Sequence, residues 1–97
     1  MSESVHESDF TVRNELGLHA RPAGLFVALA GRFSARISVA RGDEWVDGNS
    51  ILSLLSLAAG RGTTLRIRAE GHDAEEAVRA LGELLESVPD ASGARGG

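Results

Sequence analysis

Gly17-Leu18-His19-Ala20-Arg21-Pro22-Ala23 sets an imidazole and a guanidinium two residues apart, directly before a predicted helix. Pro22 has no backbone N–H, so it fits the first helical turn, where those groups lack an intrahelical partner. Because a residue before proline is disfavoured in the αR region, we expect the helix to begin near Arg21 or Pro22. Apolar side chains then recur at helical spacing, which predicts a helix face buried against a sheet. These are Ala23, Phe26, Ala30 and Phe33.

The start of this helix is suited to an anion. Free N–H groups and the positive end of the helix dipole favour an anion there by about 0.3–1 kcal/mol. Arg21 adds charge-assisted hydrogen bonds, and a phosphoryl group on the His19 ring would be such an anion. A lone histidine is more often a surface residue, so it is the surrounding pattern that favours a functional His19.

Composition limits the remaining possibilities. The chain has 97 residues, 42% of them apolar and 25% charged, as expected for one globular domain with one core. It has no apolar run near the roughly 20 residues that cross a bilayer, and its acidic N-terminus lacks the regions of a signal peptide. We therefore expect a cytoplasmic protein that does not bind membranes. The absence of cysteine excludes disulfides and thiolate catalysis.

The charge balance argues against nucleic-acid binding as a general theme. The formal net charge is −4, and all ten basic residues are arginine. Arg21, Arg32 and Arg61 are candidates for a local positive patch that would attract acidic protein partners.

Periodicity predicts seven elements in the order β-α-β-β-α-β-α. Strands are expected over residues 9–13, 35–41, 44–47 and 63–70, and the second and third form a hairpin. A compact helix follows Asn49 or Ser50 as N-cap and covers residues 50–59. A last helix follows Asp73, which with Glu76 resembles a capping box. The domain spans residues 9–88, with flexible tails at 1–8 and 89–97, and three helices cover one face of a four-stranded sheet.

The last helix has a clear apolar stripe, and the single tryptophan of the hairpin has two interpretations. Trp45 is either packing or a ligand platform, and its place on a short marginal strand favours packing. The stripe that we expect to be buried comprises Ala74, Ala77, Val78, Leu81, Leu84, Leu85 and Val88.

Two stretches resemble HPr, the histidine-containing phosphocarrier family of the bacterial phosphoenolpyruvate-dependent phosphotransferase system. One is residues 17–23; the other is Asp47-Gly48-Asn49-Ser50-Ile51-Leu52-Ser53-Leu54-Leu55-Ser56-Leu57. The resemblance runs without an obvious gap from about Phe10 to Ser87. It implies an α+β fold, an open-faced β-sandwich with an antiparallel sheet.

The resemblance also implies a function. His19 would accept a phosphoryl group on Nδ1 from enzyme I, itself charged by phosphoenolpyruvate, and pass it to an EIIA domain. Arg21 would neutralise charge during transfer, and Ala20 and Arg21 would bind the phosphoryl group at the helix N-terminus. Such a protein is a monomeric substrate of enzymes rather than an enzyme, and it needs no cofactor or metal.

The second motif combines regulation and docking. Ser50 is explained by its N-cap role alone, whereas the resemblance implies phosphorylation by HPr kinase/phosphorylase and signalling to a transcriptional regulator. Because nearly every position of this helix is apolar, one side must stay outside the core. We expect Ile51, Leu52 and Leu55 to form an exposed docking surface, with Leu54 and Leu57 in the core.

Two questions stay open in the sequence. Leu57-Ala58-Ala59, followed by Gly60-Arg61-Gly62, departs from the Leu-Gly common in sugar-transport HPr and looks more like the nitrogen-related branch. The other interpretations are a regulatory paralogue not coupled to sugar uptake, a non-catalytic binding module and a metal-dependent hydrolase. The hydrolase is disfavoured because the three histidines lack the spacing of metal ligands.

Overall fold

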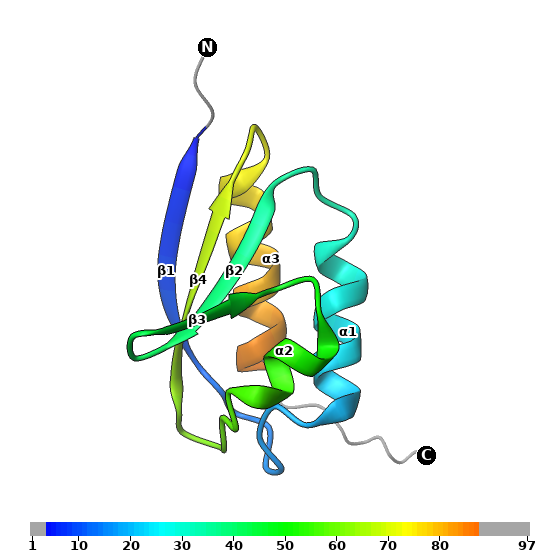
Figure 1. The fold of residues 1–97 in the computed structure, drawn as a ribbon, viewed down its shortest axis with the longest axis vertical. Helices are drawn as coiled ribbons and strands as arrows, with labels where there is room; N and C mark the ends of the chain where they lie inside the picture. The colour runs from blue at the N-terminus through cyan, green and yellow to red at the C-terminus, as the bar shows by residue number, and fades with distance from the viewer. Residues whose placement is uncertain (1–3, 88–97) are drawn as a thin grey trace.

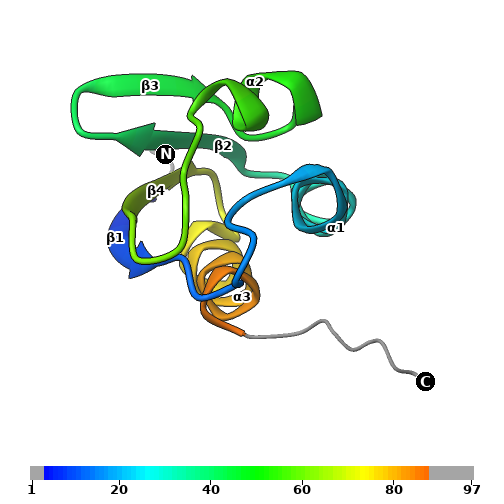
Figure 2. The ribbon, with the colours of Figure 1, turned by 90° about the horizontal axis from the view of Figure 1, so that it is seen from below.

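The computed structural model describes residues 4–87, which form a four-stranded antiparallel sheet covered on one face by three helices (Figures 1 and 2). The strand order is β1-β4-β2-β3, and the element order β-α-β-β-α-β-α and the open-faced sandwich are as predicted. The elements are β1 (Val5–Thr11), α1 (Ala20–Ala30), β2 (Arg36–Arg41), β3 (Glu44–Asp47), α2 (Ile51–Ser56), β4 (Thr64–Glu70) and α3 (Ala74–Glu86).

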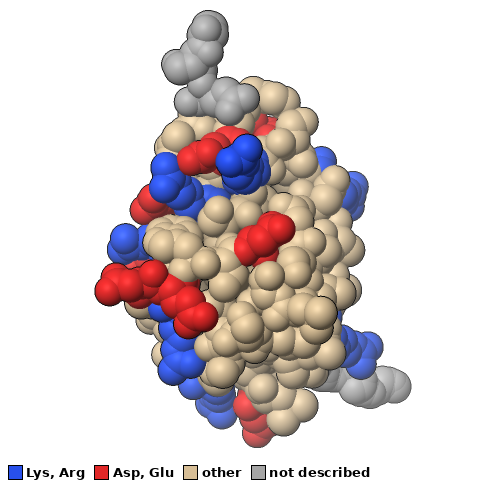
Figure 3. Space-filling model, viewed as in Figure 1, with Lys and Arg blue, Asp and Glu red and all other residues tan. Residues whose placement is uncertain are grey.

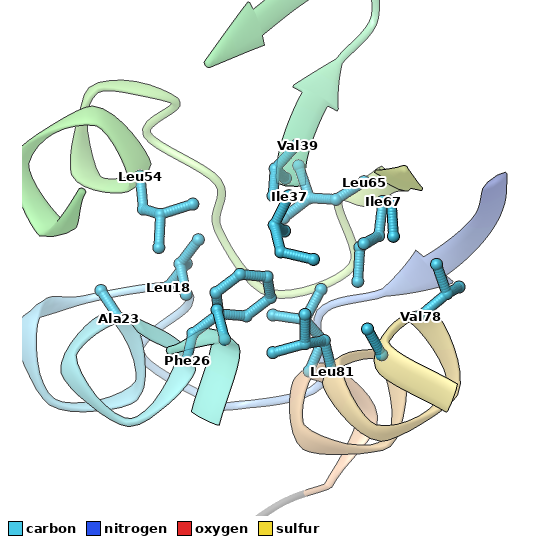
Figure 4. Close-up of a cluster of buried hydrophobic side chains, with 14 of the residues drawn as sticks. Leu18, Ala23, Phe26, Ile37, Val39, Leu54, Leu65, Ile67, Val78 and Leu81 are labelled. Atoms are coloured by element: carbon cyan, nitrogen blue, oxygen red, sulfur yellow. The ribbon is translucent and has the colours of Figure 1, made fainter. Parts of the chain in front are cut away.

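The core lies between the sheet and the helices. Alternation in β4 turns Leu65, Ile67 and Ala69 inward, as predicted, and all three are fully buried. Val39 of β2 pairs with Ile67, so the inward rows of the two strands are in register. The helices add the buried side chains that close this core from above the sheet (Figure 4). The largest of them are Phe26, Leu54 and Leu81.

The opposite face of the sheet is polar. Arg66 of β4 bonds Asp9 of β1 at 2.8 Å, and that hydrogen bond lowers the pKa of the Asp9 carboxyl. Both side chains are about half exposed, so the pair contributes little to stability, and this face of the sheet is in contact with solvent. Trp45 pairs with Ala40 on this outer face; it is 43% exposed and lies outside the hydrophobic core, so the predicted packing role is not confirmed.

The predicted N-terminal tail is partly wrong. Residues 5–8 belong to β1, where Val5 pairs with Glu70 and Ser8 with Ile67. The strand was missed because Val5-His6-Glu7-Ser8 carries no apolar alternation, and backbone pairing with β4 replaces that signal. The predicted C-terminal tail, residues 89–97, and Val88 lie outside the described residues.

Both shorter helices differ from prediction at their ends. α1 begins at Ala20 and stops before Phe33, which packs against the core from the following turn. α2 ends at Ser56 rather than at residue 59, because Ala58 adopts a left-handed conformation with φ of +50°.

The capping box at Asp73 is also wrong. Within residues 4–87 the Asp73 carboxylate makes no cap hydrogen bond to α3; it accepts the backbone N–H groups of Ser34 at 2.8 Å and Ala35 at 2.9 Å. The bond from Ser34 is the main reason that the pKa of Asp73 is lowered. Asp73 therefore joins the start of α3 to the segment that enters β2.

Gly82 in α3 allows β1 and α3 to approach each other closely. It is buried, and a Cβ atom at this position would overlap the ring of Phe10. Gly24 in α1 is different, since the nearest atom to its added Cβ would be Cδ1 of Ile51 at 3.9 Å.

We predict opposite effects for the same substitution at these two glycines. Gly82→Ala should destabilise the fold by about 1–3 kcal/mol, because the Phe10 ring must move. Gly24→Ala should stabilise it by roughly 0.5–1 kcal/mol, through helix propensity alone. Urea unfolding followed by circular dichroism measures both. A Gly82→Ala midpoint equal to that of the wild type would contradict this account of the packing.

Candidate functional site

His19 occupies the N-cap of α1. Its backbone is extended, with φ of −92° and ψ of −172°, and its carbonyl accepts the N–H of Ala23 at 3.0 Å. This bond closes the first turn, so Ala20 and Arg21 are helical despite the preference of a residue before proline for extended backbone. The His19 side chain is partly buried, and within residues 4–87 it caps no N–H group of the helix.

Two backbone donors are left at this helix end. Pro22 has no N–H, and among the described residues the N–H groups of Ala20 and Arg21 have no acceptor. The Arg21 side chain is exposed at the same end. The structure therefore brings His19, Ala20 and Arg21 together at a helix terminus whose donors and dipole favour an anion.

The loop before His19 is fixed by its contact with the segment after α2. The N–H of Leu18 donates to the carbonyl of Ala59 at 2.8 Å, and the Leu18 side chain is buried in the core (Figure 4). Gly17 has φ of +76°, and a Cβ there would lie 2.5 Å from the Ala59 oxygen. Only glycine combines this conformation with so close an approach. The position of the His19 backbone therefore depends on the contact between Gly17-Leu18 and Ala59-Gly60.

The segment after α2 carries a local strain. Ala58 is the one non-glycine residue of the described chain with positive φ, a conformation that costs about 1–2 kcal/mol for an L-residue. The Arg41 guanidinium lies beside it. Nη1 of Arg41 donates to the carbonyls of Leu57 and Ala58, both at 2.9 Å.

The start of α2 lies against α1. Ser50 is the N-cap, as predicted, and its Oγ accepts the N–H of Ser53 at 3.2 Å. Ile51 follows, and its Cδ1 approaches Gly24 of α1. The start of the second sequence motif therefore lies against the helix that follows the first.

The predicted exposure on α2 is confirmed for Ile51 and Leu52 but not for Leu55, which packs against the core. Leu52 is 80% exposed and Ile51 41%, while Leu55 is partly buried. Leu54 and Leu57 are buried in the core, as expected. Figure 3 shows an uncharged surface over α2 and the adjoining part of α1.

Two further exposed leucines were not predicted. Leu16 is 75% exposed in the loop before His19, and Leu25 is 54% exposed on α1. Leu25 does not belong to the apolar stripe that starts at Ala23. Its exposure could have been predicted, because a leucine outside the buried face of a helix points to solvent. The signal for Leu16 was weaker, because single exposed apolar residues in loops are common.

The three arginines of the predicted positive patch do not lie at one end of the molecule. Arg32 follows the C-terminal end of α1, about 16 Å from the end that holds Arg21, because the helix has 11 residues. Arg61 lies in the segment next to Gly60, whose Cα faces Gly17. Arg21 and Arg61 thus belong to the His19 end of the molecule, and Arg32 does not.

Residues 4–87 contain no group of three His, Asp or Glu side chains placed to hold a metal ion. No helix of the described chain has the length and apolarity to cross a membrane.

Comparison with known proteins identifies the family. A family model described as the PTS HPr component phosphorylation site matches residues 6–87. The phosphocarrier protein HPr of Pseudomonas aeruginosa is 47% identical over 78 residues, which cover 79% of this chain and 87% of that protein. The crystal structure of HPr from Bacillus anthracis has a TM-score of 0.82 at 40% identity, with 86% of this chain and 99% of that chain covered.

A third relative carries the same domain within a longer chain. The multiphosphoryl transfer protein of Salmonella typhimurium is 35% identical over 88 residues, which are 88% of this chain and 23% of that protein. The match of the family model over nearly the whole described chain agrees with the sheet topology and with the motif around His19. The chain belongs to the HPr family, the phosphocarrier proteins of the phosphotransferase system.

Proposed function

We propose that His19 accepts a phosphoryl group from enzyme I and passes it to an EIIA domain. The observation that carries the proposal is the imidazole at the N-cap of α1, beside two N–H groups without acceptors and the Arg21 guanidinium. These groups are donors for the equatorial oxygens of a phosphoryl group in transfer.

The chemistry is a pair of in-line displacements. The lone pair of the neutral Nδ1 attacks phosphorus, a P–N bond forms, and the bond from phosphorus to the donor breaks with its electron pair leaving on the donor. Transfer to EIIA reverses these roles. Ala20 and Arg21 hold the phosphoryl oxygens through their N–H groups, and the Arg21 side chain offsets their charge.

Partial exposure suits a carrier. A deep pocket would hold the phosphoryl group too tightly for transfer, whereas a site at a solvated helix end contributes on the order of 1 kcal/mol. We propose that the protein is a substrate of enzymes rather than an enzyme, that it acts in the cytoplasm as a monomer, and that it uses no cofactor.

We predict that mixing the protein with enzyme I and phosphoenolpyruvate adds one acid-labile phosphoryl group. Intact mass spectrometry measures the gain, and His19→Ala should abolish it. His72→Ala is the matched control and should leave it unchanged, because His72 lies in the turn between β4 and α3. A wild-type protein that stays unmodified by an active enzyme I would contradict the carrier function.

The exposed side of α2 is the proposed docking surface for enzyme I and EIIA. Ile51, Leu52 and Leu55 lie on a helix whose start contacts α1, the helix that His19 caps. Phosphorelay partners must separate after each transfer, so a small apolar surface is sufficient. The exposed Leu16 and Leu25 are candidates to extend it.

We predict that Leu52→Glu raises the KM for transfer from enzyme I by roughly tenfold, because a charge would be desolvated at the contact. Rates of phosphoryl transfer over a range of protein concentrations measure it. Val5→Glu is the matched control, since Val5 is 51% exposed on β1, away from α2. An unchanged KM for Leu52→Glu would remove α2 from the docking surface.

Regulatory phosphorylation of Ser50 by HPr kinase/phosphorylase is a second proposal. The Ser50 hydroxyl is partly buried and accepts the Ser53 N–H, so the kinase must give up one weak cap hydrogen bond to reach it. A phosphate there would add about −1.5 to −2 charges beside Ile51 and Leu52 and would change their affinity for partners, including a transcriptional regulator.

We predict that the kinase adds one acid-stable phosphate to the wild type and to Ser53→Ala, but not to Ser50→Ala. Peptide mass mapping locates the phosphate. Ser53→Ala is matched because it removes a hydroxyl from the same helical turn. The proposal fails if an active kinase leaves Ser50 unmodified.

The Leu57-Ala58-Ala59 sequence favours the nitrogen-related, regulatory branch over sugar transport. Ala58 takes the left-handed conformation in which glycine is unstrained, at the place where the Leu-Gly of sugar-transport HPr would supply that glycine. Competition between a sugar-specific and a nitrogen-type EIIA for the phosphorylated protein separates the two branches.

A further inference from the structure

Arg41 connects the sheet to the end of α2. It is the last residue of β2, and its Nη1 donates to the carbonyls of Leu57 and Ala58, both at 2.9 Å. These carbonyls follow the helix, where backbone oxygens lack intrahelical donors. A cationic donor at a helix C-terminus satisfies such oxygens and interacts favourably with the dipole.

These two carbonyls belong to the peptide groups directly before and after Ala58, the strained residue. Ala58 has φ of +50°, and its own N–H donates to the carbonyl of Leu55 at 3.0 Å. The next carbonyl, that of Ala59, is the acceptor for the N–H of Leu18 at 2.8 Å. Arg41 therefore binds the two carbonyl oxygens that precede the Ala59 carbonyl in the chain. The Ala59 carbonyl in turn accepts the N–H of Leu18, the residue before His19.

We infer that Arg41 is a positioning residue for His19. It holds Ala58 in the left-handed conformation, which places the Ala59 carbonyl for Leu18 and so fixes the backbone that enters His19. This inference rests on the proposed function of His19 as phosphoryl acceptor. Arg41 acts through the backbone and does not bind the phosphoryl group.

The physical reason is that an alanine does not hold this conformation by itself. Without the two hydrogen bonds, the carbonyls of Leu57 and Ala58 turn to water and Ala58 relaxes toward negative φ. The Ala59 oxygen then moves away from the Leu18 N–H. In-line transfer is sensitive to such a shift, because a displacement of about 1 Å lowers rates by up to about a hundredfold.

The test compares Arg41→Gln with Arg36→Gln. Arg36 is an exposed arginine at the other end of β2 and controls for loss of a charge from that strand. In Arg41→Gln, hydrogen exchange at the Leu18 amide should accelerate about tenfold relative to the amide of Ile67 in the central sheet. The kcat for transfer from enzyme I should fall by about five- to tenfold, with KM within twofold. Arg36→Gln should change neither quantity.

A second substitution separates this mechanism from general loosening. Adding Ala58→Gly to Arg41→Gln should restore most of the transfer rate and of the Leu18 protection, because glycine adopts positive φ without strain. Arg41→Gln with unchanged Leu18 exchange or unchanged kcat overturns the inference, and so does a double variant that is no better than Arg41→Gln. A wild-type protein that never gains a phosphoryl group refutes the proposed function itself, which is a different result.

Discussion

The hydrogen bond from the Leu18 N–H to the Ala59 carbonyl joins the two halves of the structure that make the site. It attaches the loop before α1 to the segment after α2, which is 41 residues away in sequence. Gly17 makes the approach possible, and the burial of Leu18 excludes water from the contact. An interaction of this kind contributes about 0.5–1.5 kcal/mol to stability, but its larger role is geometric. Together with the buried Leu18 side chain, it fixes the backbone that leads into His19 from outside α1.

Features that depend on nearest neighbours could be predicted from the sequence. The proline turn placed His19 at a helix start, Ser50 was identified as an N-cap, and β4 showed its inward row directly through alternation. The division of the α2 side chains between core and surface was also predictable in part, because a helix that packs on one side of a sheet cannot bury all of its faces. The order of the helices and strands could therefore be predicted, and so could the position of both motifs at the start of a helix.

Features that depend on distant partners could not be predicted. Asp73 carries the local pattern of a cap, yet it accepts the N–H groups of Ser34 and Ala35, 39 and 38 residues away. The first half of β1 has no apolar alternation and is defined by its pairing with β4. Arg41 carried no signal in the sequence, because its acceptors are backbone carbonyls that only the tertiary fold brings to it.

The uncapped start of α1 has a thermodynamic consequence. A capping side chain usually accepts one N–H group of the first helical turn, whereas His19 accepts none and leaves those of Ala20 and Arg21 open within the described chain. A phosphoryl group on the His19 ring would supply the missing acceptor, so loading the carrier would also complete its helix. By linkage, the free energy of folding and the free energy of the P–N bond would then be coupled, and a sequence change that frays α1 would raise the phosphoryl-transfer potential of the loaded protein.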